Sequence, residues 1–113
     1  MTSYAFVAPI LPGKLDAWKR LCAEVSGPRK SQHVQARQRA GVTRELVWLQ
    51  QTPQGDMAIV YWDADDPGRA MQYMATSSDP HDRWFVEQAK EIHGIDLTQA
   101  PPPPNTLTTE WRV

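Results

Sequence analysis

The feature that most constrains the fold is a pair of apolar segments, residues 42–51 and 56–63, separated by the turn-forming residues TPQG. Strand-forming segments joined by such a short spacer are typical of a β-hairpin. Apolar side chains occupy both alternating faces of each segment: Leu46 and Trp48 alternate with Val47 and Leu49, and Ile59 and Tyr61 alternate with Val60 and Trp62. A sheet with one face in water would alternate apolar and polar residues instead. We therefore expect both faces of this hairpin to be covered.

The residues before the hairpin predict one strand and two helices. Residues 4–9 form a short segment with aromatic and β-branched side chains, which is typical of a strand. Pro9, Pro12 and Gly13 then predict a turn. Apolar residues at three- and four-residue spacing predict a first helix over 14–25. A second helix is predicted over 31–40, with Ser31 as its N-cap and Gly41 just past its end.

The residues after the hairpin predict two more helices and a last strand. Asp66 and Asp79 each precede a proline, and an acidic cap followed by proline is a common helix start. The second of these helices is expected to end before Gly94. Residues 101–104 (PPPP) form a stiff spacer. Beyond it, the alternating segment 106–113 (TLTTEWRV) predicts a terminal strand.

These elements predict an α+β fold: a ferredoxin-like βαββαβ arrangement with extra helices, in which a four-stranded antiparallel sheet carries its helices on one face. The length of 113 residues suits a single domain over residues 1–113. Because the helices would cover only one face of the sheet, a second copy of the chain is the simplest cover for the other. We therefore expect a homodimer that forms through the sheet face.

Composition narrows the classes of partner. Lys plus Arg total 12 against 13 Asp plus Glu, so the net charge is -1, without the positive field that nucleic acids select. No RNP1-like pattern of an RNA-binding sheet is present either. No segment approaches the roughly 18 apolar residues that span a bilayer, and no signal-like start is seen. We expect a cytoplasmic protein that binds neither nucleic acid nor membrane. Cys22, the only cysteine, is expected to be a buried thiol.

Three segments carry a resemblance: residues 39–62 (RAGVTRELVWLQQTPQGDMAIVYW), 77–85 (SSDPHDRWF) and 91–97 (EIHGIDL). They resemble an uncharacterised bacterial family of the dimeric α/β-barrel, ferredoxin-like superfamily, which includes antibiotic-biosynthesis-type monooxygenases. The resemblance implies a dimeric α/β barrel of two face-to-face sheets, with a ligand cleft between sheet and helices. Haem-degrading members share an Asn, Trp and His set with the Asn near the first strand. The only Asn here is Asn105, so that set is incomplete.

The best candidate for a catalytic residue is His81, within SSDPHDRWF. On a helix that starts at Pro80, His81 shares one face with Phe85 and Ile92, and Trp84 lies one turn on. An inward imidazole could serve as a general base or orient a ligand, and Trp84 could contact that ligand. The alternative is that His81 forms only a hydrogen bond between helix and sheet.

Other candidate ligand contacts lie in the basic segment and on the hairpin. Residues 29–44 hold five basic side chains and no acid, and His33 and Arg37 stand one helical turn apart. They could bind an anionic ligand together, or simply face water. Trp48, Tyr61 and Trp62 lie on the hairpin, where one set of alternating side chains can line the cleft while the other set meets the partner; core packing is the alternative for each. The sequence does not say which set lines the cleft.

No cofactor or metal is expected. The sequence has no HxxxH, HExxH or CxxC spacing, and no GxGxxG, P-loop or GxSxG motif. Two functions remain open. One is a metal-free small-molecule enzyme, monooxygenase-like or isomerising, acting on an aromatic or polyketide-like substrate in the cleft between sheet and helices. The other is a non-catalytic dimeric protein that binds a small aromatic or anionic ligand or a protein partner.

Overall fold

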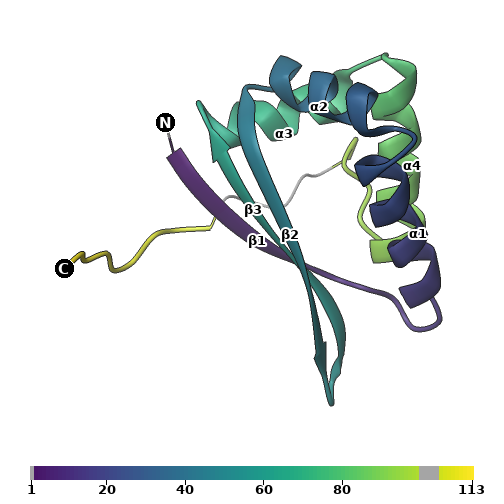
Figure 1. The fold of residues 1–113 in the computed structure, drawn as a ribbon, viewed down its shortest axis with the longest axis horizontal. Coiled ribbons are helices and arrows are strands. Elements are labelled where there is room, and N and C mark those ends of the chain that lie inside the picture. Colours follow the sequence, from purple (N-terminus) through teal and green to yellow (C-terminus); the bar gives the residue numbers. More distant parts are fainter. Residues whose placement is uncertain (1, 100–104) are drawn as a thin grey trace.

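The computed structural model describes residues 2–99 and 105–113. Three strands form one antiparallel sheet in the order β1-β3-β2, so β1 and β2 are its edges. The helices lie on one side of this sheet (Figure 1). In chain order the elements are β1 (Thr2–Pro9), α1 (Leu15–Ser26), α2 (Lys30–Arg39), β2 (Val42–Thr52), β3 (Gly55–Ala64), α3 (Pro67–Thr76) and α4 (Pro80–His93).

The predicted hairpin is confirmed. Strands β2 and β3 pair antiparallel, and Thr52 pairs with Gly55 across the turn. The Thr52 hydroxyl donates to the carbonyl of Gly55 at 2.8 Å and accepts from the backbone N–H of Gln54 at 3.2 Å. Gly55 has a φ of 136°, which a residue with a side chain rarely adopts. The turn thereby fixes the register and, with it, the face on which each hairpin side chain lies.

Most of the predicted helix ends are confirmed. The Asp66 carboxylate accepts from the N–H of Arg69, and the Asp79 carboxylate accepts from the N–H of His81. Gly94 has the left-handed conformation expected after the last helical residue. The prediction for Ser31 is wrong, because α2 begins one residue earlier, at Lys30, with an N-cap that makes no side-chain hydrogen bond.

The predicted four-stranded ferredoxin-like βαββαβ sheet is wrong, and so is the dimeric α/β-barrel class that was built on it. The sheet has three strands, and residues 105–113 form no strand. Leu107 and Trp111 of this segment are 75% and 80% exposed, and the segment runs away from the sheet on the side opposite the helices (Figure 1). Alternating residues satisfy the strand pattern, but a strand also needs a neighbouring edge to pair with. The predicted spacer 101–104 lies outside the described residues.

The sheet has one covered and one open face. Pairing places Val7, Ile59 and Trp48 side by side across the three strands on the face without helices, where Val7 is 56% and Trp48 49% exposed. The opposite side chains point into the layer between sheet and helices. Within the described residues, none of the helices has the length and apolar character needed to cross a bilayer.

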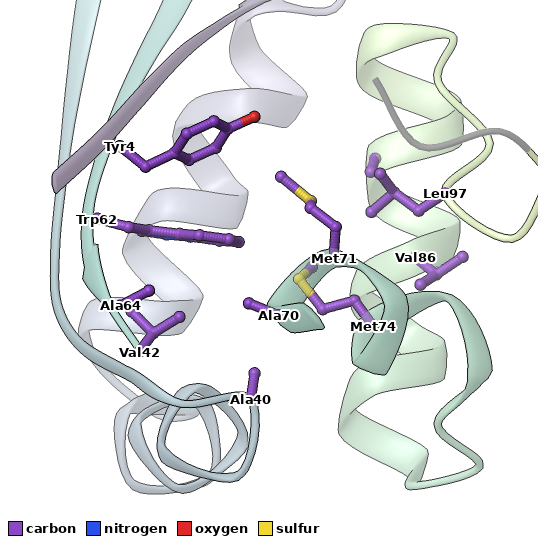
Figure 2. Packing of buried hydrophobic residues seen from close by; sticks show 11 residues of the cluster. Tyr4, Ala40, Val42, Trp62, Ala64, Ala70, Met71, Met74, Val86 and Leu97 are labelled. Atoms are coloured by element: carbon purple, nitrogen blue, oxygen red, sulfur yellow. The ribbon is translucent and has the colours of Figure 1, made fainter. Parts of the chain in front are cut away.

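Two clusters of buried side chains join the sheet to the helices. In the first, Tyr4 and Trp62 project from the sheet toward Met71 and Met74 of α3 and Val86 of α4 (Figure 2). The second lies nearer the hairpin turn and is formed by Ile10, Trp18, Leu21, Ala58 and Ile92. Between the sheet and the helices, the packing leaves room for a cavity.

Candidate functional site

A cavity of about 110 Å³ lies between the covered face of the sheet and the helices, with a largely apolar wall. Aromatic rings from β1, β3 and α4 line it, namely Phe6, Trp62 and Phe85. The rings of Phe6 and Trp62 meet edge to face with their centroids 5.4 Å apart. Three polar side chains of the wall, His33, Arg37 and Glu45, gather at the end of the cavity beside α2 and β2, and His93 lines it from α4. This combination of an apolar body and a polar end is typical of a small-molecule site.

Glu45 of β2 is the centre of the polar end. Its Oε1 accepts a hydrogen bond from Nε2 of His33 at 2.9 Å. Its Oε2 accepts from Nε of Arg37 at 2.9 Å and from the indole N–H of Trp62 at 2.7 Å. Three donors from α2 and β3 therefore converge on one carboxylate, and His33, Arg37 and Trp62 are all buried.

A β-bulge brings Glu45 to this position. The pairing shifts between Val42, which faces Ala64, and Arg44, which faces Asp63, so that Glu45 pairs with Trp62. Because side chains alternate along a strand, Val42 and Glu45 could not share a face without an extra residue between them. The bulge thus turns the carboxylate toward the helices. On α2, the one-turn spacing of His33 and Arg37 presents both side chains to it.

The electrostatics of the cluster favour an anionic Glu45. Burial alone would raise the pKa of this carboxyl, but the charge of Arg37 and the hydrogen bonds from His33 and Trp62 outweigh it. The pKa of Glu45 therefore lies well below its ordinary value. The Arg37 guanidinium in turn lies 4.6 Å from the centre of the Phe85 ring, a contact in which a desolvated cation is stabilised by the ring.

His81 extends the cluster away from Glu45. Its Nε2 lies 3.1 Å from Nδ1 of His33, and its other ring nitrogen, Nδ1, is fully enclosed without a hydrogen-bond partner among the described residues. Burial, followed by the nearby His33, Arg37 and Arg29, lowers the pKa of His81, and only Asp82 opposes this shift. His81 is therefore a neutral imidazole at pH 7.

The anionic Glu45 decides where the protons of the two imidazoles lie. A carboxylate can only accept, so His33 carries a proton on Nε2 and donates it to Glu45. When His33 is neutral, its Nδ1 keeps a lone pair and accepts from the Nε2–H of His81. That leaves a bare lone pair on Nδ1 of His81. A proton can pass between the rings only if Nδ1 of His81 takes up a proton as the proton on its Nε2 moves to Nδ1 of His33.

An open groove leads to the same cluster from outside. It has a volume of about 460 Å³ and lies between α1, α2 and the edge strand β2. The groove and the cavity share Cys22, His33, Arg37 and Glu45 as lining residues. These side chains therefore form the wall between solvent and cavity. Burial and the charge of Glu45 raise the pKa of the half-buried Cys22 thiol, which makes it a poor nucleophile at neutral pH.

The structure brings together three of the candidate residues named from the sequence, His33, Arg37 and His81. Trp84 lies beside His81, with the two ring centres 5.5 Å apart, and the guanidinium carbon of Arg29 lies 3.8 Å from the centre of the Trp84 ring. Of the candidates, His33, Arg37 and Trp62 line the cavity, His81 and Trp84 do not, and Trp48 and Tyr61 lie on the open face of the sheet. The hydroxyl of Tyr61 instead donates to Asp63 at 2.6 Å.

Sequence reasoning missed two members of the site, Glu45 and Phe85, whereas Trp62 was one of the three hairpin aromatics considered. The signal for Glu45 was available, because it is the first acid after the basic segment 29–44 and alternates with the apolar Val47 and Leu49. Phe85 was placed on the inward face of its helix, but not beside Arg37.

No three His, Cys, Asp or Glu side chains in residues 2–99 and 105–113 form a group that could hold a metal ion. Neither a protein-family model nor a curated protein matches the chain. The family resemblance described from the sequence therefore stays a prediction. The function has to be argued from the site itself.

Proposed function

We propose that the chain is a small-molecule enzyme that moves a proton within a small, largely apolar ligand, an isomerising reaction. The observation that carries the proposal is the buried chain of Glu45, His33 and His81 at the polar end of an apolar cavity. A base held in one tautomer by a carboxylate is the arrangement that general acid–base catalysis needs. The reaction is argued from these groups alone.

His33 is the residue proposed to exchange the proton with the ligand. Its ring lines the cavity, and Glu45 holds the proton on Nε2, which makes Nδ1 the basic atom. Nδ1 is bonded to His81 when no ligand is present, so the ligand takes the place of that bond. Glu45 is the positioning residue, because its lowered pKa makes it too weak a base for the task.

An isomerisation balances without any further reactant. His33 Nδ1 takes a proton from one carbon of the ligand, and the electron pair of the broken C–H bond shifts into the ligand as an enolate. The same nitrogen returns the proton to a different atom of the ligand. The Arg37 guanidinium, in contact with the cavity, stabilises the negative oxygen that forms in between.

A second function has an observation in its favour. Both ring nitrogens of His33 and both oxygens of Glu45 already have partners within the protein. Polar side chains whose hydrogen bonds are made within the protein also suit a protein that only holds a ligand. Their hydrogen bonds would then fix the shape of the cavity. The two functions differ in whether a bound ligand loses and regains a proton.

Phenylpyruvate in D₂O distinguishes them, because the hydrogens beside its keto group exchange through the enol. We expect the wild-type protein to accelerate this exchange, followed by proton NMR, and His33→Gln to abolish the acceleration. Lys19→Gln, on the exposed side of α1, is the matched control and should exchange like the wild type. Phenylpyruvate binding without accelerated exchange would favour the holding protein, and no binding would contradict both functions.

We also propose that a second copy of the chain covers the open face of the sheet. The apolar row of Val7, Ile59 and Trp48 crosses all three strands, and a two-fold interface sets this row against itself, apolar on apolar. Single exposed apolar residues are ordinary, but a contiguous row marks an interaction surface. The homodimer is independent of the chemistry proposed for the cavity.

A cytoplasmic location is part of the same proposal. Cys22 is a free thiol, as is common where the compartment keeps thiols reduced. Fractionation of cells that express the full chain tests the location: recovery with the cytosolic enzymes supports it, and recovery from the membrane or periplasmic fraction contradicts it.

A further inference from the structure

We infer that the ligand of this cavity is a small aromatic monocarboxylate, held with its ring among the aromatic side chains and its carboxylate on Arg37. The inference rests on the proposed function, whose ligand it assigns to a chemical class. Four observations support it: the unused donors of Arg37, the charge of the groove, the chemistry of the cavity wall and the volume of the cavity.

Arg37 has more donors than the protein uses. Its side chain is only 7% exposed. Its Nε donates to Glu45, and its Nη1 makes only a weak contact, 3.7 Å long, with the sulfur of Met74. Its Nη2 has no acceptor among the described residues, yet it is not one of the two fully enclosed unpaired nitrogens, which are His81 Nδ1 and Arg83 Nε. The Nη1–Nη2 edge is therefore open to an acceptor from the cavity or the groove.

That edge suits a carboxylate. The guanidinium presents two parallel N–H donors there, and a carboxylate accepts both at once. Glu45 takes the Nε of the same guanidinium, so a ligand oxygen at Nη1 and Nη2 does not have to displace it. Met74 offers only a thioether sulfur, which is a weak acceptor that a ligand can replace.

The groove outside the cavity is positively charged. Lys30, Arg37 and Arg44 line it, and Glu45 is the only carboxylate among its lining residues. Lys30 and Arg44 have no acidic partner within 4.0 Å in the described part of the chain. A cleft lined mainly by one sign of charge raises the local concentration of the opposite ion. An anion is therefore drawn to the place where Arg37 is exposed.

The cavity limits the size and the chemistry of the part of the ligand that lies beyond the carboxylate. Phe6, Trp62 and Phe85 offer aromatic surfaces, against which a ring packs favourably. A cavity of roughly 150 Å³ in another protein holds one benzene molecule. The 110 Å³ found here is smaller, so it admits no more than a single ring, and the carboxylate stays at the polar end. Larger fused ring systems would need the helices to move.

Benzoate and benzamide provide the test, because they share size and shape and differ in charge. We expect the wild-type protein to bind benzoate about tenfold more tightly than benzamide at low salt, measured by ligand-detected NMR titration. Arg37→Gln should remove this preference. Glu45→Gln should strengthen benzoate binding, because the neutral glutamine no longer offsets the positive charge of Arg37. Lys19→Gln, outside groove and cavity, is the control for net charge and should bind like the wild type.

The outcomes separate this inference from the proposed function. Equal affinities for benzoate and benzamide in the wild type would overturn the assignment of a carboxylate and leave the cavity as a ligand site. Absence of binding for benzoate, benzamide and toluene would overturn the cavity as a ligand site as well. If Arg37→Gln does not fold, Glu45→Gln decides: benzoate affinity that stays equal or falls contradicts the inference.

Discussion

The Nδ1 atom of His33 lies 3.1 Å from Nε2 of His81, and the two rings meet nearly edge to face, at 74°. One histidine comes from α2 and the other from the first turn of α4, 48 residues later in the chain. At one end of this pair, Nε2 of His33 donates to Glu45. At the other end, Nδ1 of His81 has no hydrogen-bond partner among the described residues.

The carboxylate of Glu45 should be essential for the stability of the fold. Glu45→Ala leaves the buried Arg37 without a counter-charge and the Trp62 indole without an acceptor. Loss of one member of a buried charge pair costs about 3 kcal/mol. We expect a fall of that size in the free energy of unfolding, measured with urea. Glu91→Ala removes an exposed ion pair with Lys14 and should cost well under about 1 kcal/mol. Equal effects would contradict the central role of Glu45.

Acid should destabilise the fold through His81. Burial and the neighbouring positive groups lower the pKa of His81 below its ordinary 6.5. As the pH falls through 6.5, the unfolded chain takes up a proton that the folded chain does not, so the free energy of unfolding falls. Urea unfolding at pH 8, 7, 6 and 5 measures the loss. His93, whose pKa is also lowered by burial, adds a loss of the same sign.

His81→Gln isolates the contribution of His81. Glutamine keeps polar atoms near His33 but does not titrate, so the loss of stability between pH 7 and 5 should become shallower. His93→Gln is the matched variant, because it removes a titrating imidazole that donates to the carbonyl of Pro9 and lies outside the pair. A pH profile of His81→Gln that parallels the wild type would show that His81 titrates normally in the folded chain.

The cavity should tolerate a larger side chain. Ala89 lines it from α4, and Ala89→Leu fills space without displacing a core residue. We expect no loss of unfolding free energy and the loss of toluene binding. Ala70→Leu makes the same change on α3, at a fully buried position that does not line the cavity, and should cost about 2 kcal/mol by overpacking. A similar cost at both positions would mean that the cavity is not open.

The open sheet face should control association. We expect sedimentation velocity at micromolar concentration to give a dimer for the wild type. Trp48→Lys places a charge at the β2 end of the apolar row and should give monomers with an unchanged helical spectrum. Val34→Lys, at an exposed apolar position on α2, is the control and should remain dimeric. A monomeric wild type would contradict the proposed interface.

The sequence was sufficient where the structure depends on local signals. The hairpin followed from two apolar segments and a four-residue turn, and the caps at Asp66, Asp79 and Gly94 followed from the preferences of single residues. His33 and Arg37 were paired correctly because their spacing is one helical turn. Each of these features needs information from only a few neighbouring residues.

The sequence was insufficient where distant segments decide the outcome. Residues 106–113 alternate as a strand does, but pairing requires an available edge, which the pattern does not encode. The inward position of Glu45 depends on a bulge that follows Val42, and its role depends on side chains from α2 and β3. The face of the hairpin that lines the cavity likewise became clear only from the packing of the helices.

The most direct test of the account is an NMR titration of the ¹⁵N-labelled protein with benzoate, observing the indole N–H of Trp62 and the ring nitrogens of His33. Both groups contact the cavity and Glu45. We predict saturable shifts of both signals with one affinity, and their absence in Ala89→Leu. Shifts confined to Trp48 and Trp111, or signals of His33 and Trp62 that do not respond, would contradict a ligand site built around Glu45.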